Sequence, residues 1–470
     1  MSATATTEKK YLKWYQKLAY GSGDLASNCS YGLVSSFVLL YLTGTLGLDS
    51  AIIGSLMLAS KVLDGISDVI FGTLIDRTHS KLGKARPWML FGQVGVSLCL
   101  FLLFAIPAGS TTMQYIYFFI VYTALNAVFY TANGIAYSSL VALITKNNNE
   151  RVQLGSFRFM FAVVTNIFMG FAVTGMVEKF GSGAAGWRTT ALIFAIVGLV
   201  VNTISCLAVK ELPEEELSGN TSEAAEEGKA VAEEKKHGFA ETAKILVHNK
   251  YYLMILAIYI VYYIMSNLTT GAGVFCATYY WGDGSLLGQF SMMKMFPVII
   301  ALAIAPVLIK KTGSMQKVNF WGYAISSVLG IPMIYFAMQK NLSMFLLFMF
   351  IKGIFAGTLS GSLNALIAEA SGYTTRTTGI HMDGMMYSCS SLGVKVGGGI
   401  GTAAVGWLLK LGGFVGTATV QSESAIRMIF NLYITFPFVI GIIITVLLAF
   451  LDVEKANKKW DAERQKEAQA

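Results

Sequence analysis

The 470-residue sequence is 54% hydrophobic and 13% charged, with a mean hydropathy of +0.58. This composition excludes a soluble protein, because a soluble chain of this length would divide into domains with polar surfaces. The formal net charge of +8 does not indicate nucleic-acid binding, because the basic residues gather in short loops between apolar segments. The sequence therefore predicts an all-α polytopic membrane protein.

Apolar runs of a length that spans a bilayer as a helix recur along the chain. Residues 1–24 come before them and are polar, basic and aromatic, without the pattern of a cleavable signal peptide. We expect twelve membrane-spanning helices, at residues 28–47, 51–75, 87–107, 114–144, 157–178, 188–209, 250–272, 285–309, 318–338, 343–368, 383–409 and 427–451.

A polar segment between the sixth and seventh spans divides the chain into two halves. Residues 210–249 are rich in Glu, Lys, Ala and Gly and have few aromatic or β-branched side chains, so they cannot form a core. The predicted domains are an N-terminal six-helix bundle (1–209), a cytoplasmic linker (210–249), a C-terminal six-helix bundle (250–451) and a cytoplasmic tail (452–470). Two halves joined by a polar linker are typical of transporters built from repeats.

Basic residues in the short loops predict the orientation of the chain. The loop after the second span, the loop after the eighth span and the tail are rich in Lys and Arg, whereas the loops after the first and third spans have none. Because basic loops stay on the cytoplasmic side, both termini are expected there, in a protein of the cell (inner) membrane.

Nothing in the sequence indicates catalytic chemistry or a resident cofactor. The histidines are scattered, and no loop carries a cluster of His, Asp and Glu that a membrane-embedded enzyme would need. The cysteines all lie in apolar runs, where we expect small buried residues and no disulfides; they are Cys29, Cys99, Cys206, Cys276 and Cys389.

Three ionisable residues lie in the second span, in the stretch "SKVLDGISDV". Lys61, Asp64 and Asp68 fall within an arc of about 100° on one helix face. Each charge costs roughly 2.5–3.5 kcal/mol at mid-bilayer, so the three must face one another or a cavity. One interpretation is a structural Lys–Asp pair. The other is a site where the carboxylates bind Na⁺ or a proton and Lys61 keeps the empty site neutral.

Further charges fall inside other spans, namely Arg158, Lys294, Lys352, Glu369 and Lys395. The long side chains of Lys294 and Lys352 can reach a membrane interface. Lys395 lies among glycines at every fourth position from 393 to 401, a spacing that allows close helix packing. Such a lysine needs a partner, and we expect the carboxylates of the second span to provide it.

Amide, hydroxyl and aromatic side chains gather in the fourth and seventh spans. Tyr130, Asn133 and Tyr137 lie in the fourth, and Asn267 lies in the seventh beside tyrosines and a serine. This combination suits a sugar, which offers hydroxyl groups at its edge and C–H groups on its face.

Several segments resemble the glycoside–pentoside–hexuronide cation symporters, the melibiose-permease-like branch of the major facilitator superfamily. The similar segments are "YGSGDLASN", "KVLDGISDVIFGTLIDRTHSKLGKARPW", "GSFRFMF" and "SLGVKVGGG". The resemblance covers essentially the whole chain. It implies two helical bundles around a central sugar site, alternating access, and coupling to Na⁺, H⁺ or Li⁺.

The resemblance also implies roles for individual residues. Asp64 and Asp68 match cation-site aspartates, with Lys61 and Lys395 near them, and Arg158 matches a sugar-site arginine. Asp76, Arg77 and Arg86 match the loop that forms the cytoplasmic gate.

The sequence departs from melibiose permease where that protein carries two further aspartates and a tryptophan. Asn28, Gly134 and Ser138 occupy these positions, with Asn133 adjacent. A galactoside is therefore in doubt as the substrate, and the smaller number of carboxylates favours H⁺ over Na⁺. Glu369 is a candidate additional proton carrier.

The sequence thus predicts a monomeric secondary transporter that brings a sugar into the cell together with H⁺ or Na⁺. An exporter or organic-anion carrier of the same superfamily is the alternative, and a non-transporting sugar sensor also fits this fold.

Overall fold

The computed structural model describes residues 9–213, 245–380, 383–418 and 420–469, and every regular element in these ranges is a helix. Most of the predicted linker, residues 214–244, lies outside them. Eleven described stretches are long and apolar enough to cross a membrane. The helix α3 (Ser50–Asp76), which carries the Lys61, Asp64 and Asp68 cluster, has 27 residues and is not among the eleven. With α3, these stretches account for the twelve predicted spans.

The chain forms two compact units. Unit 1 comprises Met1–Gly219, Ala277–Gly288 and Gly406–Ile426, and unit 2 comprises Asn220–Cys276, Gln289–Val405 and Arg427–Ala470.

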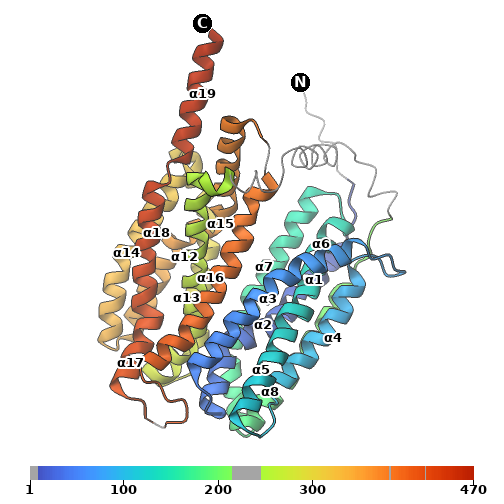
Figure 1. Cartoon of the computed structure of the whole chain (residues 1–470), viewed down its shortest axis with the longest axis vertical. Coiled ribbons are helices and arrows are strands. Elements are labelled where there is room, and N and C mark those ends of the chain that lie inside the picture. Colours follow the sequence, from blue (N-terminus) through green and yellow to red (C-terminus); the bar gives the residue numbers. More distant parts are fainter. Residues whose placement is uncertain (1–8, 214–244, 381–382, 419, 470) are drawn as a thin grey trace. The chain divides into compact units, whose positions relative to one another are not determined.

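Unit 1 contains the helices of the first half of the chain, drawn from blue to green in Figure 1. Its core helix α2 packs against α7 and α8, α4 packs against α6 and α8, and α3 packs against α5 and α6. Besides α3, the elements are α1 (Trp14–Gly21), α2 (Gly23–Leu40), the π-helix η1 (Tyr41–Thr45), α4 (Arg86–Leu103), α5 (Thr111–Thr123), the π-helix η2 (Ala124–Tyr130), α6 (Thr131–Ile144), α7 (Asn148–Lys179) and α8 (Gly183–Leu207).

One carboxylate fixes the loop between α3 and α4. Glu211, just beyond α8, accepts hydrogen bonds from the backbone amides of Lys84, Ala85 and Arg86 at 2.7, 3.0 and 3.1 Å. These amides lie where α4 begins and have no partner within the helix. Gly83 precedes them with φ +110°, and any side chain there would overlap the Glu211 carboxylate.

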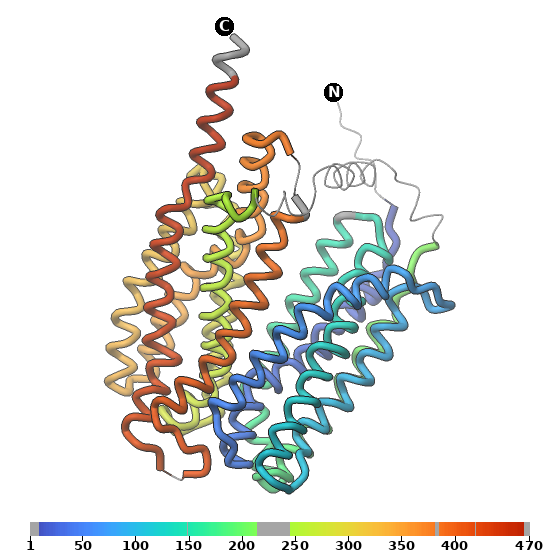
Figure 2. Tube along the Cα trace, in the orientation of Figure 1, coloured from blue at the N-terminus to red at the C-terminus, as the bar shows by residue number. Residues whose placement is uncertain are grey.

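Unit 2 contains most of the second half of the chain. In it α14 packs against α15 and α18, and α12 packs against α15 and α18. Figure 2 shows α19 following α18 at the end of this unit. The elements of the second half are α12 (Lys250–Phe275), the π-helix η3 (Cys276–Tyr280), α13 (Leu286–Thr312), α14 (Met315–Met338), α15 (Leu342–Thr378), α16 (Asp383–Leu411), α17 (Glu423–Phe430), the π-helix η4 (Asn431–Thr435), α18 (Phe436–Phe450) and α19 (Val453–Gln469).

Glycines bring two helix pairs of unit 2 into close contact. A methyl group at Gly397 of α16 would overlap the Ile260 carbonyl of α12, and one at Gly401 would lie 2.6 Å from the Ile264 carbonyl. A methyl group at Gly353 of α15 would lie 2.8 Å from Cβ of Pro297 in α13. The spacing of the glycines at 393–401 therefore serves helix packing, as predicted.

The cysteines behave as expected from the sequence. All five are buried and free, which confirms that they are small core residues.

Candidate functional site

The charged cluster of α3, the second span, lies against the first and fourth spans of unit 1. The Lys61 ammonium is 3.8 Å from Oδ2 of Asp64 and lies over the Tyr31 ring, 5.7 Å from its centroid. Tyr31 stacks on Tyr130 with ring centroids 5.3 Å apart. Lys61 and Asp64 are both half-buried, so the predicted face of α3 carries a loosely spaced charge pair beside two aromatic rings.

The hydroxyl of Thr131 links Asp64 to a neighbouring π-helix. Thr131 Oγ1 lies 2.7 Å from Oδ1 of Asp64 and 2.9 Å from the carbonyl oxygen of Asn126. Asn126 belongs to η2, whose wider turn ends directly before Thr131. A hydroxyl has one hydrogen, so Thr131 can donate to only one of these oxygens at a time. Its lone pairs can accept a hydrogen bond from a protonated carboxyl.

The remaining predicted cation-site residues lie on separate helices. Asp68 is one turn beyond Asp64 on α3 and is half-buried. Lys395 is half-buried among the glycines of α16 in unit 2. Its predicted pairing with the carboxylates of α3 stays a prediction.

A second charged cluster in unit 1 contains a residue that the sequence interpretation missed. Nε of Arg158 donates to Oδ2 of Asp24 at 2.6 Å, and its guanidinium lies 4.2 Å from the centroid of the Tyr137 ring. The Tyr137 hydroxyl in turn donates to the carbonyl of Tyr20 at 2.8 Å. Asp24 lies in the quoted motif "YGSGDLASN", and its signal was a carboxylate one turn before the predicted Asn28.

Two predicted amide residues hold helices together. The side-chain oxygen of Asn28 accepts a hydrogen bond from the Asn166 amide at 2.9 Å, which joins α2 to α7. The Asn133 amide is buried and donates to Oε1 of Gln93 at 2.6 Å, which joins α6 to α4. In this conformation Asn133 therefore faces a protein partner.

The predicted gate residues differ in their surroundings. Asp76 ends α3 and is exposed, as is Arg77. Arg86 is buried, and its guanidinium donates to the carbonyls of Cys206 and Leu82 at 3.1 and 3.3 Å. Arg86 therefore holds the start of α4 against the end of α8.

Two predicted site residues of unit 2, the candidate sugar-binding Asn267 and Glu369, bond to other residues of unit 2. The Asn267 amide donates to the carbonyl of Tyr263 in the same helix at 2.9 Å. Glu369 accepts a hydrogen bond from the Asn457 amide of α19 at 2.9 Å. This contact fixes α19 against α15.

An ion pair lies at the N-terminal end of α3. Nζ of Lys410 lies 2.5 Å from Oδ2 of Asp49, and the Asp49 carboxylate also caps α3 by accepting from the Ala51 amide. Burial tends to raise the pKa of Asp49, but the hydrogen bonds from Lys410, Ala51 and Ile52 outweigh burial and hold that pKa below its usual value. Asp49 is therefore an ionised partner of Lys410 at neutral pH.

The side chains of these clusters form ion pairs and hydrogen bonds that a bound ion or solute can replace. Among the residues described, no three His, Cys, Asp or Glu side chains come together in a metal-binding arrangement. Half-buried carboxylates beside lysine, arginine, hydroxyl and tyrosine groups can bind and release a proton, a monovalent cation or a polar solute.

Comparison with known proteins identifies the family. Residues 19–455 match the family described as MFS/sugar transport protein. The chain belongs to this family. It is 26% identical to an isoprimeverose transporter of Lactiplantibacillus pentosus over 98% of this chain and 93% of the relative. It is 24% identical to the inner membrane symporter YicJ of Escherichia coli (strain K12) over 90% of this chain and 88% of that relative.

The fold has solved counterparts. A bacterial homologue of the human lysosomal transporter Spinster superposes with a TM-score of 0.69 at 13% identity, over 95% of this chain and 98% of that structure. The predicted major facilitator fold and the resemblance to glycoside–pentoside–hexuronide symporters are confirmed. The protein is a multi-pass membrane sugar transporter of the major facilitator superfamily and is not an enzyme.

Proposed function

We propose that this transporter is a symporter that carries a glycoside, pentoside or hexuronide into the cell together with a proton, and that Asp64 is the coupling carboxylate. The observation that supports the proposal is the position of the Thr131 hydroxyl between Asp64 and the Asn126 carbonyl. A carboxylate that couples symport must be stable in both its protonated and its ionised form.

Thr131 gives Asp64 a hydrogen bond in either form. When Asp64 is ionised, the hydroxyl donates to it, and Lys61 at 3.8 Å balances the charge. When Asp64 is protonated, its O–H donates to Thr131, and the Thr131 hydrogen turns to the Asn126 carbonyl. Because neither form leaves a buried polar group without a partner, the change of protonation avoids a large penalty.

Arg158, Asp24 and Tyr137 are the groups we propose for sugar recognition. A guanidinium and a carboxylate can exchange hydrogen bonds with sugar hydroxyls, and an aromatic ring packs on the C–H face of a sugar. Isoprimeverose, which the relative from Lactiplantibacillus pentosus carries, is therefore a reasonable first test substrate. Asn28 and Tyr130 are further candidates from the same unit.

Alternating access requires each side of the membrane to close in turn. We infer from the basic loop after α3 that this loop and both termini are cytoplasmic. Asp76, Arg77 and Arg86 then belong to the cytoplasmic gate, and the pair between Asp49 and Lys410 closes the other side. The proposed carrier reorients only when it is empty or carries both sugar and proton.

Transport by purified protein in liposomes tests the proposal. Uptake of isoprimeverose, a pentoside and a hexuronide is measured under separate H⁺ and Na⁺ gradients and with a membrane potential. One charge moved across 100 mV is worth about 2.3 kcal/mol, or roughly fifty-fold accumulation. Asp64→Asn should abolish accumulation and retain sugar exchange, whereas Glu178→Gln at an exposed position should behave as the unsubstituted protein.

Two outcomes would overturn the proposal. The coupling role of Asp64 is wrong if Asp64→Asn still accumulates sugar against its gradient. Net export from preloaded liposomes under the inward H⁺ gradient, with no sugar uptake, would favour the exporter alternative.

A further inference from the structure

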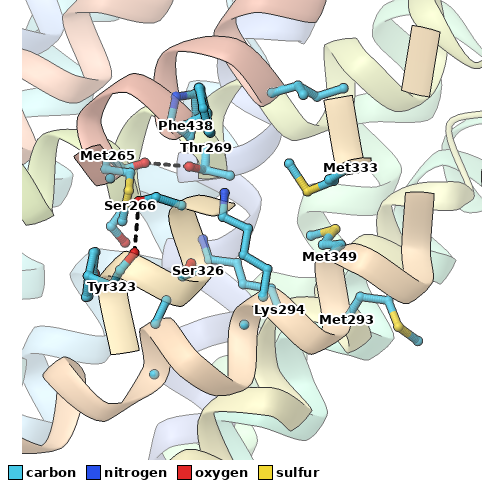
Figure 3. A pocket seen from close by; sticks show the side chains of 18 of the residues that line it. Met265, Ser266, Thr269, Met293, Lys294, Tyr323, Ser326, Met333, Met349 and Phe438 are labelled. Carbon is cyan, nitrogen blue, oxygen red and sulfur yellow. Dashed lines mark hydrogen bonds between the residues drawn. The ribbon is translucent and has the colours of Figure 1, made fainter. Parts of the chain in front are cut away.

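Unit 2 contains a partly open cavity of about 180 Å³ that the proposed coupling mechanism does not use. A single water needs about 10–15 Å³ of such space, so the cavity has room for a small organic molecule. All of its lining residues belong to unit 2 and come from the helices α12, α13, α14, α15 and α18 and from η4. Figure 3 shows the Lys294 side chain reaching into this space, with Ser266 and Ser326 on one side and Met333 and Met349 on the other.

Two lysines line the cavity and no acidic residue does. The lysines are Lys294 of α13 and Lys352 of α15. Nζ of Lys294 lies 3.1 Å from the hydroxyl of Thr270. Lys352 has neither a hydrogen bond nor an ion pair with any residue in the described ranges. The cavity therefore holds two amino groups without a counter-ion from its lining.

The two lysines come from helices that touch at this level. A methyl group at Gly353, the residue after Lys352, would lie 2.8 Å from Cβ of Pro297 and 3.6 Å from the carbonyl oxygen of Met293. Met293 directly precedes Lys294. The absence of a side chain at Gly353 therefore brings two basic residues into the same cavity, where their charges repel each other in a medium that screens them weakly. Such an arrangement is costly while both lysines are charged, and an anion bound between them would remove that cost.

Hydroxyl groups also line the cavity. Many of the lining residues carry one, and the hydroxyls of Tyr262 and Ser360 already bond to each other at 2.7 Å. The hydroxyl-bearing residues of the lining are Tyr262, Ser266, Thr269, Tyr323, Ser326, Ser327, Ser360 and Tyr433. Hydroxyls both donate and accept, so they suit the hydroxyl groups of a ligand, whereas lysine only donates and suits a carboxylate.

We propose that this cavity binds a small molecule with one carboxylate and several hydroxyl groups, a sugar acid or related polyhydroxy acid. Lys294 and Lys352 bind the carboxylate, and the serine and tyrosine hydroxyls bind the remainder. The proposal concerns a binding site within unit 2. It stands independently of the coupling role of Asp64, because Asp64, Asp24 and Arg158 all belong to unit 1.

Calorimetric titration of the purified full-length protein in detergent tests this site. The probes are D-glucuronate, D-glucose and acetate, which present both chemical groups, the hydroxyls alone and the carboxylate alone. Glucuronate should bind at least about tenfold more tightly than either of the others, since it alone engages the lysines and the hydroxyls. Lys294→Met and Lys352→Met should each weaken glucuronate binding by at least about tenfold and leave glucose binding unchanged.

Matched variants separate this site from others. Lys310→Gln changes an exposed lysine on the same helix as Lys294 and should not alter binding. The variants Lys294→Arg and Lys352→Arg keep the charge and should bind glucuronate within a few-fold of the original affinity. If the methionine variants do not give monodisperse protein, Ser326→Ala with Ser360→Ala tests the hydroxyl contacts, and we expect weaker glucuronate binding and unchanged acetate binding.

Three results would overturn the inference. The first is no glucuronate binding to the unsubstituted protein, and the second is acetate binding as tightly as glucuronate. The third is glucuronate binding that Arg158→Gln removes and the lysine variants do not, because the ligand would then lie in unit 1.

Discussion

Replacing Thr131 by valine should shift the pH dependence of transport. Valine keeps the shape of threonine and removes the hydroxyl that lies 2.7 Å from Asp64. A hydrogen bond to an ionised group is worth about 1.5–3 kcal/mol, and one between neutral groups about 0.5–1.5 kcal/mol. The ionised form of Asp64 therefore loses roughly 1–1.5 kcal/mol more than the protonated form. At 1.36 kcal/mol per tenfold change, the external pH of half-maximal uptake should rise by about one unit.

Initial rates of sugar uptake into liposomes between pH 5 and 9 measure this shift, with the internal pH held constant. Thr131→Ser keeps the hydroxyl and should retain the original profile. Thr123→Val provides the matched control, because the Thr123 hydroxyl is buried without a hydrogen-bond partner in the described part of the chain. An unchanged half-maximal pH in Thr131→Val, with normal sugar exchange, would refute the role of Thr131 in the proton step.

Three further substitutions test other parts of the molecule. Arg158→Lys removes the planar group that pairs with a carboxylate and stacks on a tyrosine ring, so the KM for sugar should rise about tenfold or more; an unchanged KM would exclude Arg158 from sugar binding. Gly397→Ala should lower the free energy of unfolding by about 1–3 kcal/mol, because its methyl group overlaps a backbone carbonyl. Gly372→Ala is the control: its methyl group would meet no atom within 4 Å, so the free energy of unfolding should not fall in this way. Thermal unfolding of the two variants measures the difference. The pKa of Asp49 is lowered, so its pair with Lys410 is intact at all pH values above the usual carboxyl range and is lost only as the pH falls through that lowered pKa. Asp49→Asn should therefore change the uptake rate by the same factor at every pH from 5 to 8. A shifted pH profile would contradict this.

The membrane spans could be predicted from the sequence because bilayer thickness sets the length of each apolar run. Helix ends follow other rules and were predicted less well. The tenth span was expected to end at residue 368, yet α15 continues through the polar residues up to Thr378. The polar tail 453–469 forms α19 because it is rich in Ala, Glu and Lys, which favour helices. The apolar pattern predicts which part of a helix contacts lipid, but it does not predict the residue at which the helix ends.

The site could be predicted only where its residues lie close together in the sequence. Lys61 and Asp64 share one helix, so periodicity placed them on one face, and the structure joins them in one cluster. Asp24 and Arg158 are 134 residues apart, and no local pattern joins them. Lys352 was given little weight because a lysine in a span can reach an interface. Only the packing of α13 against α15 directs it into a cavity.

The carboxylate of Glu211 accepts hydrogen bonds from three successive backbone amides and so ties the loop after α3 to the end of α8. Separating this loop from α8 would break all three hydrogen bonds at once and leave the three amides without Glu211 as their acceptor. Small thermal fluctuations should therefore not separate the loop from α8. We therefore expect the start of α4, the end of α3 and the end of α8 to move together as one rigid corner of unit 1 when the transporter changes conformation.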